Sequence, residues 1–463
     1  MCFKTPIPHS FPFALLLALF LALTPARVCL VSSAQAEPLT VFEGLEMVTS
    51  RSYEVRIARE YRDAARQTEQ AARSRRLPQI TAYADQTWLE NRPEGIFGGG
   101  SSPLGEDEFL RYGISLTQSI TDFGRTKAGI TSARALSRVE EERLSAARNT
   151  TALAFLQGYI NLLQAEKALS VTKQEVRRFE AHLSDAKALY DAGEVTRSDI
   201  LSAEVNLAEA VLKNLTAGDD RELAISRVNF LVLRPLDQPL EVFDFPSPFV
   251  GIPEIEDLTR MAKANRPELQ ILDDKVAARE AQVSLQKSDH YPRLFAGGGY
   301  SYEENPYRVH EDNWSLMLGI TWDLYSGGAV SAEERKALRE LAAVMTEREK
   351  VKRSIFLEIR EERQRLKGAV NRTQVACQAL RQAEENLRLQ KAKYQEGEAS
   401  ATDVTDAVTA LTRAGNNHWA AVYDGMRAQA RILFCAGTVL AHAYDGMGPD
   451  GDSKDSTDVK TGE

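Results

Sequence analysis

Two segments of the chain alternate apolar residues with polar or small residues at a period of two. The apolar positions are Leu110, Tyr112, Ile114 and Leu116 in the first segment, and Trp314, Leu316, Leu318 and Ile320 in the second. This alternation predicts strands with one apolar face. Weaker strand patterns over residues 80–90 and 294–302 precede them, so we expect two β-hairpins. Four strands of about ten residues suit a tilted crossing of a bilayer, but they cannot close a barrel, so several chains must pool their strands.

Helical periodicity replaces this alternation after each pair of strands. Proline-free runs over residues 125–190 and 329–394 each hold 66 residues, which make about 100 Å of helix. Apolar positions in the second run follow alternating three- and four-residue steps, the spacing of a coiled coil. Helices over 196–232 and 400–440 would return along these two and complete helical hairpins, and helices over 40–76 and 254–288 would lead into the strands.

The chain contains the same unit twice. Residues 190–199 reappear as residues 394–403, at a shift of 204 that also carries Gly124 onto Gly328. Upstream, Pro78 matches Pro292 at a shift of 214, so the first copy holds ten extra residues. We assign this insertion to residues 92–103, a loop rich in Gly, Ser and Pro.

These patterns divide the chain into five segments. They are a signal peptide over 1–36, a first strand-helix repeat over 37–233, a Pro-rich linker over 234–253, a second repeat over 254–440 and an acidic, disordered tail over 441–463. The strand hairpins are expected at about 79–120 and 293–325, and the helical hairpins at about 125–232 and 329–440. The predicted fold is therefore mainly helical, with long coiled-coil hairpins and four β-strands per chain.

The N-terminus has the layout of an export signal. Residues 13–23 are entirely apolar, follow Lys4, and precede Ala34-Gln35-Ala36, a small-x-small cleavage motif. An uncleaved anchor is the alternative, but the position of the motif favours cleavage, with a mature chain that begins near Glu37.

Charge and cysteine content narrow the classes of function. Removing residues 1–36 takes away two of the 57 basic residues and none of the 66 acidic ones, which leaves 55 minus 66, or −11. This balance disfavours binding of nucleic acid. The mature chain keeps two of the four cysteines, too few for a disulfide scaffold. The sequence contains no nucleophile-base pattern, metal-ligand cluster or phosphate-binding loop, so we expect neither an enzyme nor a cofactor.

Short motifs complete the pattern. The run Asn265-Arg266-Pro267-Glu268-Leu269 opens a helix that ends near Tyr291-Pro292, and Asp122-Phe123-Gly124-Arg125 and Tyr325-Ser326-Gly327-Gly328 mark junctions between strand and helix. In this order, with the repeat and the export signal, nearly the whole mature chain resembles TolC-type outer-membrane efflux proteins, also called outer membrane factors.

This resemblance implies a homotrimer whose chains each give four strands to a twelve-stranded membrane β-barrel in outer-membrane lipid, with the helices forming a periplasmic α-barrel. It implies a passive exit channel for efflux or type I secretion in the outer membrane of a Gram-negative bacterium. The implied partners are a periplasmic adaptor (membrane fusion) protein and an inner-membrane transporter of the RND, ABC or MFS type. A secreted periplasmic coiled-coil scaffold without channel activity is the alternative, but it leaves the alternating strands unexplained. The substrate stays open between drugs, metals, small molecules and proteins.

The repeat turns at Gly193 and Gly397 would form the periplasmic tips and contact the adaptor, because about 100 Å of helix separates them from the junctions at Gly124 and Gly328. The resemblance implies a periplasmic aperture at the second tip, lined by Asp403, Asp406 and Tyr394. In a trimer the aspartates would form two rings of carboxylates that attract cations and narrow the pore.

A local explanation competes with the aperture. Ser400 and Asp403 have the spacing of a helix capping box, as do Thr196 and Asp199 in the first copy. The resembled family also places an arginine at this tip, where the present chain has Ala399. This departure puts the closing salt bridge of that family in doubt here.

Overall fold

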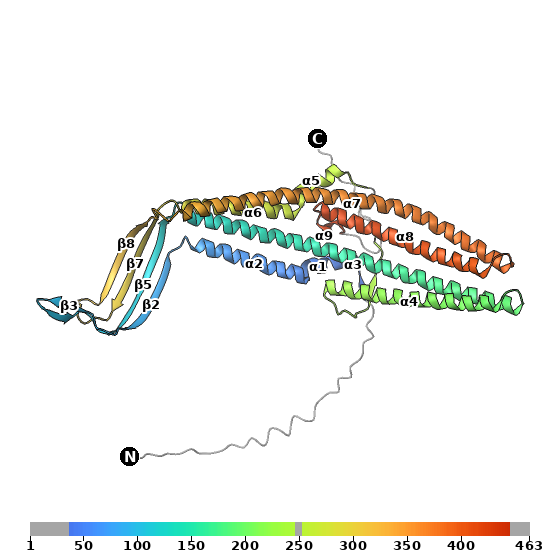
Figure 1. Cartoon of the computed structure of the whole chain (residues 1–463), viewed down its shortest axis with the longest axis horizontal. Coiled ribbons are helices and arrows are strands. Elements are labelled where there is room, and N and C mark those ends of the chain that lie inside the picture. Colours follow the sequence, from blue (N-terminus) through green and yellow to red (C-terminus); the bar gives the residue numbers. More distant parts are fainter. Residues whose placement is uncertain (1–36, 246–251, 445–463) are drawn as a thin grey trace, which may run out of the picture.

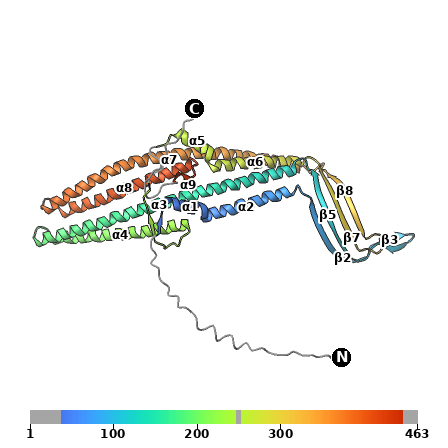
Figure 2. The ribbon, with the colours of Figure 1, turned by 180° about the vertical axis from the view of Figure 1, so that it is seen from behind.

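The computed structural model describes residues 37–245 and 252–444. The molecule is elongated, with a four-stranded sheet at one end and the turns of two long helical hairpins at the other (Figure 1). The helices that lead into the sheet, over 53–74 and 267–288, run beside the long helices in the half nearer the sheet. The return helices of the hairpins run beside them in the other half, as the opposite view also shows (Figure 2). The predicted signal peptide lies outside the described residues.

The sheet is antiparallel and joins the two predicted strand hairpins into one layer. Its order is β2 (Gln79–Trp88), β5 (Glu108–Thr121), β7 (Arg293–Glu303) and β8 (Asp312–Thr321). The central pairing of β5 with β7 connects residues about 190 positions apart, since Ile114 lies opposite Tyr300.

The pairing register collects the apolar side chains of the strands on one face. Ile114 lies beside Ala82 on β2 and Tyr300 on β7, and Tyr300 lies beside Trp314 on β8. Leu316, on the same face of β8 as Trp314, is 92% exposed. The opposite face is mixed: it carries Tyr83, Phe295 and Met317 as well as polar groups, among them an ion pair of Arg111 with Asp85 at 3.0 Å. A broad apolar surface is therefore exposed in the single chain.

Both outer edges of this sheet, β2 and β8, lack a partner strand among the described residues. The loop between β2 and β5 forms a separate hairpin of β3 (Glu94–Phe97) and β4 (Gly100–Pro103). Gly98 and Gly99 make its turn with φ of +58° and +95°, a conformation that favours glycine. The insertion predicted at 92–103 is thus an ordered hairpin that projects beyond the sheet (Figure 1).

Strand passes into helix at a glycine in both halves of the chain. Gly124 has φ of 97° and Gly328 has φ of 83°, values at which any other side chain is strained. From these glycines run α3 (Arg125–Asp191) and α7 (Ala329–Gln395), each of 67 residues and each one residue longer than predicted. The return helices are α4 (Arg197–Val232) and α8 (Ala401–Cys435).

Two helices that the sequence predicts as continuous are each broken once. The helix expected over 40–76 is α1 (Val41–Arg51) and α2 (Tyr53–Ser74), because Ser52 is extended and caps α2. The helix expected over 254–288 is α5 (Ile255–Asn265) and α6 (Pro267–Ser288). Here the proline ring disfavours helical geometry in the residue before it, and Arg266 accordingly has φ of −72° and ψ of 116°.

The C-terminal end of the second repeat also differs from the prediction. α8 ends at Cys435 rather than near 440, because Gly437 takes φ of +75° and the Thr438 N–H donates to the Leu433 carbonyl at 3.0 Å. Helix α9 (Leu440–Ala443) follows, and Tyr444 is 1% exposed. The first residues of the segment predicted as disordered tail are therefore ordered, while 445–463 lie outside the described residues.

The main core lies midway along the helices, where the two ends of the first repeat meet. β1 (Glu37–Leu39) pairs in parallel with β6 (Leu240–Val242), which belongs to the predicted linker. The Tyr159 hydroxyl accepts a hydrogen bond from the Phe243 N–H at 2.9 Å and lies 2.9 Å from the Leu39 carbonyl. The surrounding core includes Leu45, Phe155, Leu156, Ile160, Val228 and Tyr423. Among helices of residues 37–245 and 252–444, none combines the length and the hydropathy needed to cross a membrane.

Arg266 ties the break between α5 and α6 to the second helical hairpin. Its guanidinium binds the carboxylates of Glu268 at 2.9 Å and of Glu358, on α7, at 3.1 Å. It also lies 5.4 Å from the ring centre of Phe434 on α8. Arg266 is only 6% exposed, so these contacts stabilise its charge in place of the water that it loses on burial.

Replacing Arg266 with alanine should therefore destabilise the protein by about 3 kcal/mol, because it leaves two carboxylates without their shared partner. The measurement is the thermal unfolding midpoint of the purified protein. Arg260→Ala is the matched control, since Arg260 pairs with Asp257 on the exposed surface and its loss should cost less than about 1 kcal/mol. Equal effects of the two substitutions would contradict the assigned role.

Candidate functional site

The turns of the two helical hairpins share one geometry. Both α3 and α7 end in a Schellman motif around a left-handed glycine, Gly193 with φ of 80° and Gly397 with φ of 76°. The Glu194 N–H donates to the Leu189 carbonyl at 2.9 Å, and the Glu398 N–H donates to the Lys393 carbonyl at 2.8 Å. Both turns lie at the end of the molecule farthest from the sheet (Figure 1).

The return helices begin with equivalent capping boxes. The Asp199 carboxylate accepts from the Thr196 N–H and hydroxyl, both at 2.8 Å, and the Asp403 carboxylate accepts from the Ser400 N–H at 2.8 Å and hydroxyl at 2.7 Å. These bonds from Ser400 hold the pKa of Asp403 below its ordinary value of 3.8. Helix capping by Asp199 and Asp403 is therefore confirmed.

Asp406 lies one turn further along α8. Its side chain is exposed and makes no hydrogen bond or ion pair with another described residue. It shares a side of α8 with Asp403, because three residues are close to one helical turn. Asp406, unlike Asp403, is not accounted for by helix capping.

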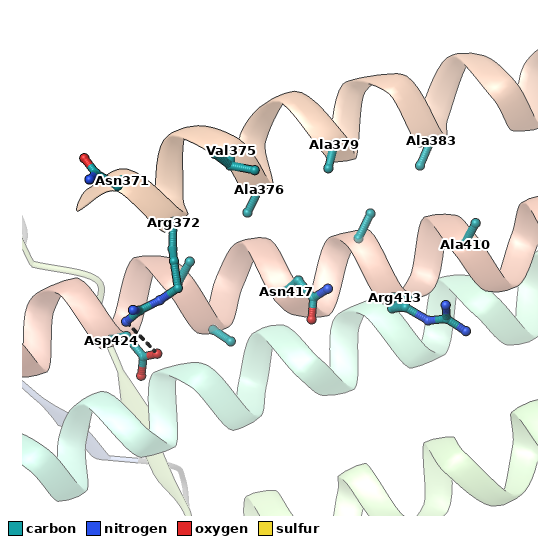
Figure 3. Close-up of a pocket in the computed structure, with 13 residues that line it drawn as sticks. Asn371, Arg372, Val375, Ala376, Ala379, Ala383, Ala410, Arg413, Asn417 and Asp424 are labelled. Carbon is teal, nitrogen blue, oxygen red and sulfur yellow. Dashed lines mark ion pairs between the residues drawn. The ribbon is translucent and has the colours of Figure 1, made fainter. Parts of the chain in front are cut away.

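The same side of α8 continues as one wall of a groove between α7 and α8 (Figure 3). From Asp406 onward, residues at alternating steps of four and three line it. On α8 these are Ala410, Arg413, Asn417, Ala420 and Asp424, and α7 contributes Val375, Ala376, Ala379 and Ala383. The groove encloses about 780 Å³. Small apolar side chains form most of it, and an ion pair of Arg372 with Asp424 at 3.7 Å lies at the end away from the tip.

Tyr394 lies apart from the two aspartates. Its ring is 2% exposed and packs among Phe179 of α3, Ala210 of α4 and Val404 of α8. Burial raises the pKa of its hydroxyl, which has no hydrogen-bond partner among the described residues. Ala399 packs against the same cluster. Tyr394 is thus buried in the apolar contact between the hairpins, whereas Asp403 and Asp406 are exposed.

The junction glycines, Gly124 and Gly328, lie at the opposite end of α3 and α7 and contribute only backbone geometry. Within the described ranges, no three His, Cys, Asp or Glu side chains are grouped so as to hold a metal ion. The charged groups along this side of α8 include the exposed carboxylates of Asp403 and Asp406 and the Arg413 guanidinium, seven residues beyond Asp406.

Comparison with known proteins assigns the family. The sequence pattern of the family described as "Outer membrane efflux protein" matches residues 45–231 and 258–438, one segment in each half of the chain. These segments cover well over half of the 463 residues. The chain belongs to the outer membrane efflux protein family. It is a channel protein of the outer membrane, and the resemblance drawn from the sequence is confirmed.

Individual relatives agree with this assignment. The chain is 22% identical over 418 residues to the alkaline protease secretion protein AprF of Pseudomonas aeruginosa, covering 87% of this chain and 85% of AprF. It is 22% identical over 400 residues to the outer membrane protein TolC of Escherichia coli, covering 82% and 78%. Its fold is similar to that of the Campylobacter jejuni CmeC outer membrane channel, with a TM-score of 0.75, 16% identity and coverage of 89% and 87%.

The two aspartates of the second tip should respond differently to substitution. Asp403→Ala removes the acceptor for the Ser400 N–H, so amide hydrogens in the first turn of α8 should exchange about three- to tenfold faster. Asp406→Ala should leave them unchanged. Because the pKa of Asp403 is lowered, its contribution is present above pH 3.8 and is lost as pH falls through the lowered pKa. Hydrogen exchange followed by mass spectrometry tests both statements, and equal exchange in the two variants would contradict them.

Proposed function

We propose that three copies of this chain form the outer-membrane exit channel of a tripartite efflux or type I secretion system. The channel passively conducts substrates from an inner-membrane transporter, through a periplasmic tunnel, to the outside. The observation that carries this proposal is the continuity of an exposed apolar sheet with helices of 67 residues, about 100 Å long. In this proposal the sheet is the membrane segment and the long helices form the wall of the tunnel across the periplasm, so one chain contributes to both.

The lateral order of the elements supports closure by several copies. The strands lie in the order β2, β5, β7, β8, and toward the tips the helices lie in the order α4, α3, α8, α7. The sheet and the helical layer therefore each have an element of the first repeat, β2 or α4, at one edge. At the other edge each has an element of the second repeat, β8 or α7. A neighbouring copy would bring β8 to β2 and α7 to α4. With four strands per chain, this pairing keeps every strand antiparallel to its neighbours around a closed barrel.

The free side of α4 has the composition expected of a covered surface. Its exposed apolar residues are Leu201, Val205, Leu212, Leu215, Leu223 and Phe230. Exposed apolar surface of this extent marks an interaction site. In the proposed trimer this side of α4 packs against α7 of the neighbouring copy. The three copies together supply the twelve strands that close the barrel.

The groove between α7 and α8 is proposed as part of the tunnel wall. Asp403, Asp406, Arg413 and Asn417 follow one side of α8, and in a closed ring each would be repeated by every copy. Asp403 and Asp406 would then form carboxylate rings at the aperture, where they attract cations. Tyr394 would act behind this surface, in the packing between the hairpins.

The proposed partners follow from the passive channel. A periplasmic adaptor would contact the tips at Gly193 and Gly397, and an inner-membrane transporter of the RND, ABC or MFS type would supply energy. Two relatives are named for protease secretion, AprF of Pseudomonas aeruginosa and PrtF of Dickeya chrysanthemi, and they favour a role in type I secretion. The family description favours a role in efflux. We also propose that residues 1–36 are removed on export. A scaffold without a channel leaves the exposed apolar sheet face without a role.

The proposed membrane face can be tested by one matched pair of substitutions. Leu316→Arg places a charge on the apolar face in the middle of β8, at a cost of about 2 to 4 kcal/mol in lipid. Its recovery in the outer-membrane fraction should fall strongly. Ser315→Arg, on the opposite face of the same strand, should insert as the unsubstituted protein does. Normal recovery of both variants would contradict a lipid contact at Leu316.

Asp406→Ala gives the cleanest test of the aperture, because Asp406 does not cap a helix. The ratio of cation to anion permeability in planar bilayers should fall about fivefold, for about 1 kcal/mol of Coulomb attraction lost in water. Asp199→Ala is the control, since it removes the equivalent cap in the first tip without altering the proposed ring. An unchanged ratio for Asp406→Ala, or an equal fall for Asp199→Ala, would remove Asp406 from the pore.

A further inference from the structure

His182 is a buried histidine at the contact between the two helical hairpins. It lies on α3 and is 3% exposed. Its ring centre is 5.2 Å from that of Tyr394 on α7. Neither ring nitrogen has a hydrogen-bond partner among the described residues, and the same holds for the Tyr394 hydroxyl. A buried imidazole without an acceptor is stable only in its neutral form.

The contact around His182 is the packing that holds the hairpins together near the tips. The apolar cluster beside it takes Phe179 from α3, Ala210 from α4, Tyr394 from α7, and Val404 and Val408 from α8. The Asn206 side chain of α4 also donates to the Thr405 hydroxyl of α8 at 3.3 Å. Separation of the hairpins would therefore have to break this cluster and expose His182 to water.

Two hollows flank the imidazole, and His182 contributes to the walls of both. One, of about 460 Å³, lies between α4 and α8 and is lined by Ser202, Asn206 and Thr405. The other, of about 170 Å³, lies between α3 and α7 and is lined by Arg178, Asp185 and Lys391. Both hollows are large enough to hold water, so a small movement of the hairpins would hydrate the ring.

The charged groups around His182 do not compensate for its burial. Asp185 of α3 and Asp199 of α4 favour the imidazolium, and Lys391 of α7 opposes it, but burial is the largest influence and lowers the pKa of His182 below 6.5. Asp185 already pairs with Lys391 at 3.6 Å, and Asp199 is engaged by Thr196. Arg177 and Arg178 of α3 add positive charge. The residues that α8 brings to the two hollows, Ala401, Thr402, Val404, Thr405 and Val408, do not ionise.

We propose that protonation of His182 loosens the contact between the α3/α4 and α7/α8 hairpins, so that mildly acidic surroundings favour separated tips. This inference rests on the proposed function in one respect, that separation of the tips widens the aperture. The packed state holds the neutral ring, and the separated state lets the imidazolium reach water. Proton uptake and separation are therefore linked.

The direction and size of the effect follow from this linkage. Above pH 6.5 the ring is neutral in both states, and the proton has no influence. Below pH 6.5 the separated state binds the proton, and the ratio of packed to separated tips falls by up to about tenfold per pH unit for each chain, until pH reaches the lowered pKa of the packed state. Three coupled chains would steepen the response.

The test measures the distance between the two tips in the assembled, full-length protein. Nitroxide labels are attached at Glu194→Cys and Glu398→Cys in a Cys377→Ser background, with labelled chains diluted by unlabelled ones, and pulsed electron paramagnetic resonance is recorded at pH 7.5 and 5.5. The population with the longer distance should rise with His182 present, by up to about tenfold for each chain. It should stay constant in His182→Phe, which keeps an aromatic ring against Tyr394 but cannot be protonated.

Controls make each outcome decisive. His182→Gln provides a second neutral variant if His182→Phe does not assemble, and His290→Gln removes an exposed histidine near the sheet and should behave as the unsubstituted protein. A pH-dependent distance that persists without His182, or no pH dependence with it, overturns the inference. Single-channel conductance of the same samples separates the two claims, because absence of any conductance contradicts the proposed channel and leaves the distance result standing.

Discussion

The unpaired edges of the four-stranded sheet impose the strongest constraint on this molecule. In a hydrocarbon environment each unpaired backbone group costs several kcal/mol, so an open edge is not tolerated in lipid. Within residues 37–245 and 252–444 the sheet has two such edges, β2 and β8, next to a face on which Leu316 is 92% exposed. Pairing with further copies is the direct way to satisfy both. The helical layer, which ends in α4 on one side and α7 on the other, is built so that the same neighbours would continue it.

The regular parts of the fold were predictable because one physical rule governs each of them. Alternation with a period of two located all four strands of the sheet, although β5 continues to Thr121, five residues past the last alternating position at Leu116. The absence of proline located α3 and α7 to within one residue. The breaks at Ser52 and Arg266 were missed because the hydrophobic period continues across them. Pro267 was a visible signal for the second break. Gly437 was a similar signal for the end of α8.

The candidate site was predictable only in part. The capping boxes follow from short local spacing, and so does the position of Asp406 one turn beyond Asp403. The groove between α7 and α8 and the burial of Tyr394 depend on which helices pack together, and they could not be read from one segment. His182 illustrates this limit. Its neighbour in space, Tyr394, is more than 200 residues away in the sequence, and no local pattern links the two.

The central claim is that closure of the sheet edges requires several copies, and that the number is three. Native mass spectrometry of the protein extracted from outer membranes measures this number directly. The account predicts a complex with three times the mass of the mature chain, which gives twelve strands. A single chain, or a complex of two, would leave too few strands for the proposed barrel and would contradict the account.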